Sequence, residues 1–345
     1  MVSKPADTRQ PGSDGPKRPP FPLALIHPLG PLFRHLPLSL RRHLLFLREF
    51  KKWGNFRKPK DISEKVQWRI LNDRRAILTF TQDKLAAKDF AARQIAASSL
   101  SANAVIPATY WVGMDVRELR ALAGKLPARW VLKPNHSCGR VRLLDSNAAP
   151  IDWDELEHVG AEWLKRDEEE LVFGHWAYSH ARHLLIAEER VGAGLHPPTD
   201  FKVRCFGGEP GLYWWGERGR FRSRIAVYTK DGEWLNVGGP YEIPKDEAEQ
   251  LYPLSVEQRS NLLDTARAIS EPFDEMRVDF FLEEGQLFFG ELTPYTASGL
   301  YAYKSKGLGQ KVGALWQLPD LTAHDPREAE WRALLEGTPK GTLQE

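Results

Sequence analysis

The sequence predicts an α+β fold, in which strands and helices are segregated along the chain. Strand-like segments separated by turn residues follow one another over residues 184–229, while helical spacing of apolar residues dominates residues 38–97. The strict strand–helix alternation of a doubly wound sheet is missing. Neither common phosphate loop occurs, because no GxGxxG lies between a strand and a helix and no GxxxxGK precedes Ser or Thr.

The individual elements are expected from apolar periodicity and from residues that begin helices or form turns. Asp152 is a helix-starting residue, and GGEP (207–210) and DGEW (231–234) supply turns between strands. The expected helices are 38–52, 62–73, 81–97, 115–124, 152–165 and 255–270, and the expected strands are 108–113, 129–134, 141–145, 184–191, 200–206, 211–217, 223–229, 277–282 and 287–293.

Composition divides the chain and indicates its environment. Residues 1–20, rich in Pro, Gly and charge, are expected to be a disordered tail, residues 21–75 an N-terminal helical extension and residues 321–345 a polar tail. Two cysteines, no apolar run of membrane-span length and no apolar leader together indicate a cytoplasmic protein. A formal charge of only +2 argues against a nucleic-acid partner.

A basic segment interrupts this nearly neutral chain. Residues 40–60 carry eight Lys and Arg side chains against the single Glu49. The helix expected at 38–52 has apolar residues on one side and cations on the other. The segment 38–60 is therefore either a peripheral contact with a membrane or a lipid-linked substrate, or a helix that packs on the main body. The sequence leaves both interpretations open.

Residues 277–293 predict a β-hairpin with a polar face. If residues 284–286 form a three-residue loop, Asp279 faces Glu291 and Arg277 faces Thr293. In that register Phe281 faces Phe289, and the other face carries Val278, Phe280, Leu282, Phe288 and Leu292.

The two facing carboxylates of this hairpin need a partner. Like charges directly opposite each other repel, and one carboxylate has to take up a proton unless a cation lies nearby. Oxygen ligands from Asp279, Glu291 and Thr293 suit Mg²⁺, which keeps several waters and shares phosphate oxygens. The alternative is a surface hairpin whose acids are solvated.

The hairpin, RVDFF…GELT followed by TASGL, resembles the metal-binding hairpin of ATP-grasp enzymes, including D-alanine–D-alanine ligases. TQDKLAAKDFA, WVLKPNHSCGR, LIAEERV and PTDFKVRCFGG resemble other ATP-grasp segments in the right order. With DISEKVQW they resemble the TupA-like ATP-grasp family, named for teichuronopeptide biosynthesis, over about residues 57–300. The resemblance implies an ATP-grasp fold: a domain at 76–320 whose two α+β lobes, 131–187 and 188–300, grip ATP.

The resemblance also implies roles for individual residues. Asp279, Glu291 and Thr293 would hold Mg²⁺, although Thr293 stands where ATP-grasp enzymes usually have Asn. Arg277 and Lys133 would act in catalysis. Lys84, Lys133 and Lys202 would bind the phosphates of ATP. Glu188 or Glu189 and the backbone near Val191 would bind the adenine, and Asp200 would bind the ribose. A flap at residues 135–140, which contains the single glycine Gly139, would cover the phosphates.

The activity implied by the resemblance is a Mg-ATP-dependent carboxylate–amine ligase that acts through an acylphosphate. Its setting would be polysaccharide or cell-surface glycan biosynthesis, with an amino acid joined to a uronic acid. The partners would be a small-molecule or glycan acid and an amine. A phosphotransferase with a hydroxyl acceptor and a non-catalytic nucleotide-binding module are the alternatives, and the sequence does not separate ligase from kinase chemistry.

Overall fold

The computed structural model describes residues 33–165, 172–192, 198–217, 224–239 and 241–345. The tail expected at 1–20 and the first part of the N-terminal extension lie outside these residues. Within the described ranges, every helix is too short or too polar to cross a lipid bilayer.

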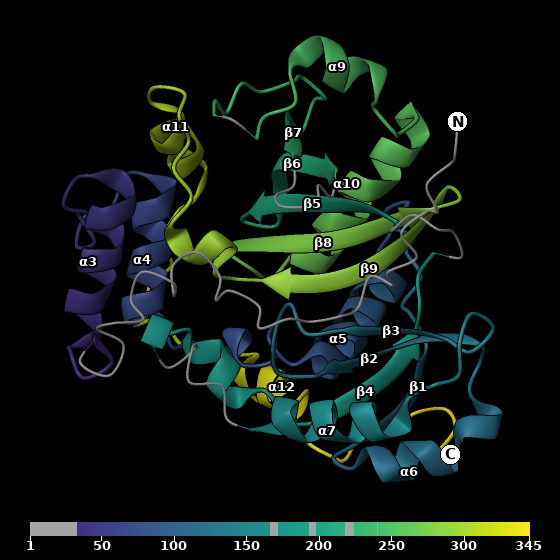
Figure 1. Ribbon diagram of the computed structural model, residues 1–345. Helices are drawn as coiled ribbons and strands as arrows, with labels where there is room; N and C mark the ends of the chain where they lie inside the picture. Colours follow the sequence, from purple (N-terminus) through teal and green to yellow (C-terminus); the bar gives the residue numbers. More distant parts are fainter. Residues whose placement is uncertain (1–32, 166–171, 193–197, 218–223, 240) are drawn as a thin grey trace, which may run out of the picture.

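Two antiparallel sheets form the frame of the molecule, one above the other in Figure 1. The first sheet has the order β1-β4-β2-β3, and the second has the order β7-β6-β5-β8-β9. Antiparallel pairing throughout both sheets confirms the α+β class. The strands are β1 (Thr109–Gly113), β2 (Arg129–Pro134), β3 (Arg142–Asp145), β4 (Leu185–Glu189), β5 (Thr199–Phe206), β6 (Glu209–Glu217), β7 (Arg224–Thr229), β8 (Glu275–Glu283) and β9 (Gln286–Thr293).

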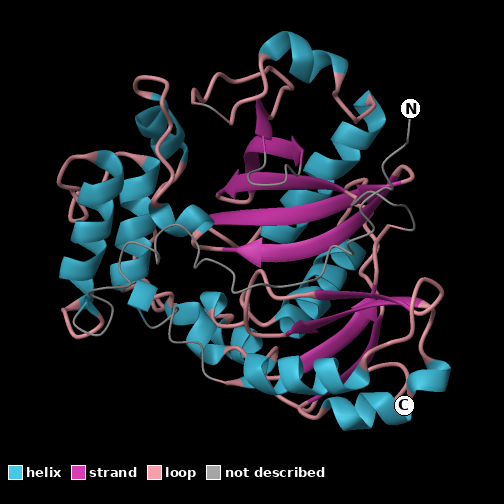
Figure 2. Ribbon diagram, in the orientation of Figure 1, coloured by secondary structure: helices cyan, strands magenta, loops and turns pink. Residues whose placement is uncertain are grey.

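Helices cover the sheets from outside and between them (Figure 2). The small core of the first sheet includes Trp111, Trp130 and Trp163, with apolar residues of α6 and α7. The large core of the second sheet takes up α5 and α10, whose apolar faces pack on its strands. The helices are α3 (Leu38–Phe50), α4 (Ile62–Asn72), α5 (Lys84–Ala97), α6 (Val116–Ala121), α7 (Trp153–Leu164), α9 (Lys245–Gln250), α10 (Val256–Ser270), α11 (Leu308–Leu315) and α12 (Glu328–Ala333).

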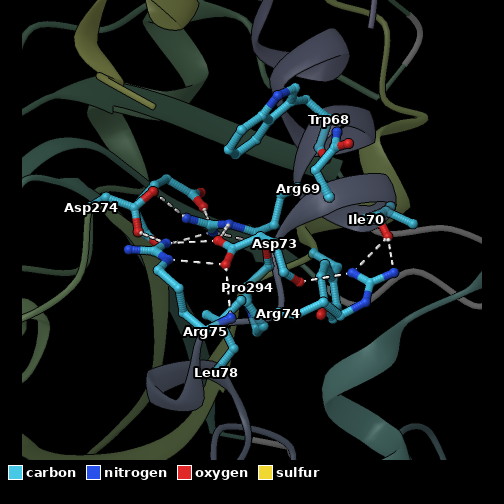
Figure 3. Close-up of polar contacts among 12 residues, drawn as sticks. Trp68, Arg69, Ile70, Asp73, Arg74, Arg75, Leu78, Asp274 and Pro294 are labelled. Atoms are coloured by element: carbon cyan, nitrogen blue, oxygen red, sulfur yellow. Dashed lines mark hydrogen bonds and ion pairs between the residues drawn. The ribbon is translucent and has the colours of Figure 1, made fainter. Parts of the chain in front are cut away.

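Helix α4 is tied to the second sheet by a buried ionic network (Figure 3). Arg69, with no exposed surface, donates to Asp274 Oδ2 at 2.6 Å, to Glu275 Oε2 at 2.5 Å and to the Pro294 carbonyl at 3.2 Å. Arg75 adds bonds to Asp73 and Asp274 at 2.7 and 2.6 Å. The network therefore links α4 to the start of β8 and to the residue after β9, which holds the open end of the β8–β9 hairpin in place.

Several segments differ from the sequence-based expectation. The first sheet begins at β1 and includes all of β4, so the two sheets divide between β4 and β5 rather than at residues 187 and 188. Segment 321–345 contains α12, whose Trp331 is buried, and Gln344 Nε2 donates to the Val112 carbonyl at 2.8 Å. Packing against distant residues orders this polar segment, and such contacts carry no local sequence signal.

Helix α3 has one buried face and one exposed face, so its position agrees with both interpretations of the basic segment. Arg42, Leu45 and Phe46 are buried against the body, whereas Leu40, Leu44 and Leu47 are exposed, as are Trp53 and most of the lysines that follow the helix. One face of α3 packs on the protein, and the membrane or lipid contact of the other face stays a prediction.

Candidate active site

The lysine side of the candidate site lies on α5, β2 and β4. Lys133 Nζ donates to Glu188 Oε1 at 2.5 Å, and Lys88 Nζ donates to Glu188 Oε2 at 2.8 Å. Burial acts to raise the pKa of Glu188, but the two ammonium groups hold it below its ordinary value. Glu188 is thus an ionised carboxylate clamped between two lysines. Glu189 accepts from the Ala108 amide at 3.0 Å, and the adenine contacts expected of Glu188, Glu189 and Val191 stay predictions.

Lys84 begins α5 and is held by the loop after β2. Asp83 caps the helix by accepting from the Ala86 amide at 2.9 Å, and Asn135 Nδ2 donates to Asp83 Oδ2 at 2.7 Å. Lys84 Nζ donates to the carbonyls of Asn135 and Ser137. The first half of the expected flap, residues 135–137, is therefore buried and anchored, while Gly139 lies in open space with a left-handed φ of 70°.

The β8–β9 hairpin carries the acidic side of the site, and its register confirms the expected polar pairs. Asp279 lies opposite Glu291, and Arg277 lies opposite Thr293. The expected three-residue loop is wrong, however: Glu283 pairs with Gln286 across a two-residue turn in which Glu284 and Gly285 have positive φ.

A β-bulge at Gly290 restores the register between turn and site. Phe280 pairs with Phe289, and Phe281 with Phe288, so the expected Phe281–Phe289 pair is wrong. Phe289 is 1% exposed in the core, whereas Phe288 is not buried. A Cβ on residue 290 would lie 2.9 Å from the Asp279 carbonyl oxygen, so only glycine fits the bulge without displacing the strand that carries the acid.

Arg277 resolves the repulsion between the two carboxylates. Its Nε and Nη2 lie 2.6 and 2.7 Å from the two oxygens of Asp279, and Nη2 lies 3.4 Å from Glu291 Oε1. Burial acts to lower the pKa of Arg277, but the adjacent Asp279 raises it above its ordinary value. Thr293 Oγ1 lies 3.3 Å from the same Glu291 oxygen, so all four predicted hairpin residues form one connected cluster.

Lys202 extends this cluster onto β5. Lys202 lies opposite Asp279 in the β5–β8 pairing, and its ammonium group donates to Asp200 Oδ2. Asp200 and Lys202 are therefore close to the carboxylate pair of Asp279 and Glu291 and to each other. Their expected roles toward ribose and phosphate stay predictions.

The lysine side and the acidic side meet at Lys84 and Glu291, which line one small cavity. Burial lowers the pKa of Lys84, and Glu291 is the strongest opposing charge. Burial and Asp279 raise the pKa of Glu291, against Arg277 and Lys84, although 40% of its side-chain surface remains exposed. Glu291 is partly exposed and its contacts with Arg277 and Thr293 are long, so it is suited to accept a cation.

The donor set of the hairpin fits Mg²⁺. Two carboxylates and a hydroxyl supply oxygen ligands, and Nη2 of one guanidinium contacts both carboxylates, so these lie close together. The described residues contain no group of three or more His, Cys, Asp or Glu in metal-binding geometry. Asp279, Glu291 and Thr293 would be the protein ligands, and Mg²⁺ with few protein ligands completes its shell with phosphate oxygens and water.

Sequence reasoning missed Lys88, which lies one helical turn beyond Lys84 on α5. The spacing i, i+4 was a usable signal, because it places both ammonium groups on one face of the helix. Lys88 Nζ also donates to Thr109 Oγ1 at 2.8 Å, which connects α5 to β1.

The chain belongs to the TupA-like ATP-grasp family, whose family model matches residues 64–316. Its fold is accordingly the ATP-grasp fold; α3 lies N-terminal to the matched residues, whereas α4 lies almost entirely within them. No curated protein sequence matches the chain at a significant level.

Solved ATP-grasp structures resemble the chain at low identity. N5-carboxyaminoimidazole ribonucleotide synthetase, in its ADP complex, is 12% identical over 62% of this chain and 45% of its own, with a TM-score of 0.39. The ATP-grasp ligase PsnB with its minimal precursor is 12% identical over 66% and 58%, with a TM-score of 0.35. D-alanine–D-alanine ligase from Bacillus anthracis is 16% identical over 68% and 67%, with a TM-score of 0.35. The chain spans less than two thirds of the first two of these proteins.

Proposed function

We propose that the protein is a Mg-ATP-dependent carboxylate–amine ligase. The observation that carries the proposal is the cavity shared by Lys84, at the start of α5, and Glu291 of β9, which brings a cation expected to bind phosphate close to the carboxylate pair. ATP would lie between the two sheets, held by Lys84, Lys133 and Lys202. Mg²⁺, held by Asp279, Glu291 and Thr293, would neutralise charge on the β- and γ-phosphates.

The reaction would proceed in two transfers. A carboxylate oxygen of the acid attacks the γ-phosphorus, the bond between γ-phosphorus and ADP oxygen breaks, and an acylphosphate forms. The amine then attacks the acyl carbon, the C–O bond to phosphate breaks, and a C–N bond forms with loss of a proton. Arg277 would stabilise the acylphosphate and the oxyanion, and its position beside the two hairpin carboxylates proposed to hold Mg²⁺ supports this role.

The family's setting suggests the substrates. We propose an acid from polysaccharide or cell-surface glycan biosynthesis, a uronic acid, joined to an amino acid in the cytoplasm. Transfer to a hydroxyl acceptor uses the same ATP site and is the competing activity.

The deciding experiment separates the two chemistries. The protein is incubated with Mg-ATP, pooled uronic acids and pooled amino acids, and ADP, free phosphate and new masses are followed. A ligase releases ADP and free phosphate only when acid and amine are both present, and hydroxylamine in place of the amine traps the acylphosphate as a hydroxamate. A phosphorylated product formed without amine and without free phosphate would identify a kinase instead. The Glu291→Gln variant is the control for contaminating ATPases.

A further inference from the structure

A second cavity, of about 200 Å³, is lined by Arg277, which contacts the carboxylates of Asp279 and Glu291. It is enclosed by the second sheet, by α4 and by the segment 296–303. Its walls are largely apolar and aromatic, whereas its cations, Lys202, Arg204 and Arg277, come from β5 and β8. The apolar and aromatic part includes Val66, Trp214, Ile225, Val227, Tyr301 and Tyr303.

The strand register makes this cavity continuous with the candidate active site. Val227 pairs with Trp214, Trp214 with Lys202, Lys202 with Asp279, and Asp279 with Glu291. Directly paired residues of neighbouring strands project to the same face of a sheet. One row of side chains therefore leads from the carboxylates of Glu291 and Asp279, across Lys202, to the cavity wall at Trp214 and Val227.

Arg204 and Thr296 line this cavity, and each carries a buried polar atom with no partner in the part of the chain that the structure describes. Arg204 is 4% exposed: its Nε donates to Glu275 Oε1 at 2.7 Å, while Nη2 is buried without an acceptor. The Thr296 hydroxyl is buried and unpartnered in the same way. Such groups cost free energy unless a ligand satisfies them. Neither atom is exposed to the cavity itself, so a ligand reaches them only by displacing neighbouring side chains. A cation and a hydroxyl on residues that line one cavity are suited to a carboxylate.

One side of the cavity is formed by a strained segment, residues 296–299, which contacts from α3 and α4 hold in place. Ala297, Ser298 and Gly299 have φ of 47°, 55° and 61°, a left-handed run that costs free energy at the first two positions. Arg42 of α3 donates to the Ser298 hydroxyl at 3.1 Å, and Gln67 of α4 donates to the carbonyls of Ser298 and Gly299 at 3.0 and 2.8 Å. Because these hydrogen bonds fix the strained backbone in one conformation, this side of the cavity is preorganised for binding.

We infer that this cavity binds the acid substrate, a monocarboxylate with one six-membered ring. The carboxylate lies between Arg277 and Arg204, facing the γ-phosphate site, and the ring lies against Trp214 and the tyrosines. The volume is roughly that of six or seven molecules of liquid water, which is the size of a single ring. This inference rests on the proposed ligase function and specifies its acid. A hexuronate and an aromatic carboxylate share this chemistry.

The test measures binding directly, by saturation-transfer NMR on the full chain with Mg-ADP. The two probes are glucuronate and 4-hydroxyphenylacetate. At least one should receive saturation on its ring protons, and the probe that does so identifies the source of the ring. Trp214→Ala should weaken that binding at least tenfold, while Trp53→Ala, at an exposed tryptophan that does not line the cavity, should leave it unchanged.

A second variant guards against misfolding of the first. Thr296→Val removes a buried hydroxyl that lacks a partner, so its Tm should stay level or rise while acid binding weakens. Thr79→Val removes a buried hydroxyl that donates to the Ala76 carbonyl at 2.7 Å, so its Tm should fall while binding is kept. Binding of neither probe, or binding that both cavity variants leave unchanged, would overturn the inference.

The outcomes also separate this inference from the proposed function. Ligation with an unchanged KM for the acid in Trp214→Ala would refute the cavity and keep the ligase. A ring acid that binds through Trp214 and Thr296, yet yields no ADP with any amine, would keep the cavity and refute the ligase.

Discussion

The two hairpin carboxylates should respond very differently to loss of charge, although each lies opposite the other. Asp279 accepts two hydrogen bonds from Arg277, and the side chains are 7% and 12% exposed. Asp279→Asn leaves this guanidinium with one neutral acceptor and only the 3.4 Å contact to Glu291. Removing one partner of a buried pair costs several kcal/mol, and the retained bond reduces this, so we expect a loss of about 2 kcal/mol.

Glu291→Gln should leave stability almost unchanged. The side chain is 40% exposed and its ionic contact is long, so the free energy of unfolding should change by less than about 0.5 kcal/mol. The sign should favour the variant, because burial and Asp279 already raise the pKa of Glu291. Both substitutions should reduce turnover by orders of magnitude, since both remove a Mg²⁺ ligand.

Urea unfolding without nucleotide or metal measures the first effect, and ADP release with saturating substrates measures the second. Asp231→Asn, an exposed carboxylate, is the matched control and should change neither. Equal stability losses in Asp279→Asn and Glu291→Gln, or full turnover in Glu291→Gln, would refute this reading of the site.

Three further changes test the lysine side, the bulge and the buried histidine. Lys133→Ala should weaken ATP binding by about 1.5–3 kcal/mol in calorimetry, whereas the exposed Lys125→Ala should not, and unchanged affinity would remove Lys133 from the site. Gly290→Ala should destabilise the protein by about 1–3 kcal/mol in urea, because the new Cβ meets a backbone carbonyl at 2.9 Å; Gly124→Ala, with open space around it, is the control. Burial, reinforced by a neighbouring arginine, lowers the pKa of His175 to about 3, so the unfolded chain binds more protons below about pH 6.5 and stability falls with pH from there toward 3. His175→Gln should reduce that slope by at most about 1.4 kcal/mol per pH unit in chemical denaturation at pH 7 and pH 5, and an unchanged slope would show that the histidine is already solvated.

The polar face of each strand of the hairpin was predictable because strand alternation is a local property. The two-residue period groups Arg277 with Asp279 on one strand and Glu291 with Thr293 on the other. The bulge at Gly290 was not predictable. The shorter turn and the bulge shift the register in opposite directions, so their effects on the pairing of Asp279 with Glu291 cancel. The face of Phe289, which lies between them, was therefore assigned wrongly.

The sequence by itself determined the α+β class and the family, and it predicted most of the residues that the structure brings together at the candidate site. Those features depend on short motifs and on their order and spacing along the chain, which can be read without knowledge of the tertiary contacts. Only the tertiary structure decided how the motifs meet: Glu188 between Lys88 and Lys133, Arg277 against both carboxylates, and Arg42 beside the strained segment at Ser298. These contacts join residues far apart in the chain, and burial gives them their energies. Neither the partner nor the dielectric around a side chain can be read from its neighbours in sequence.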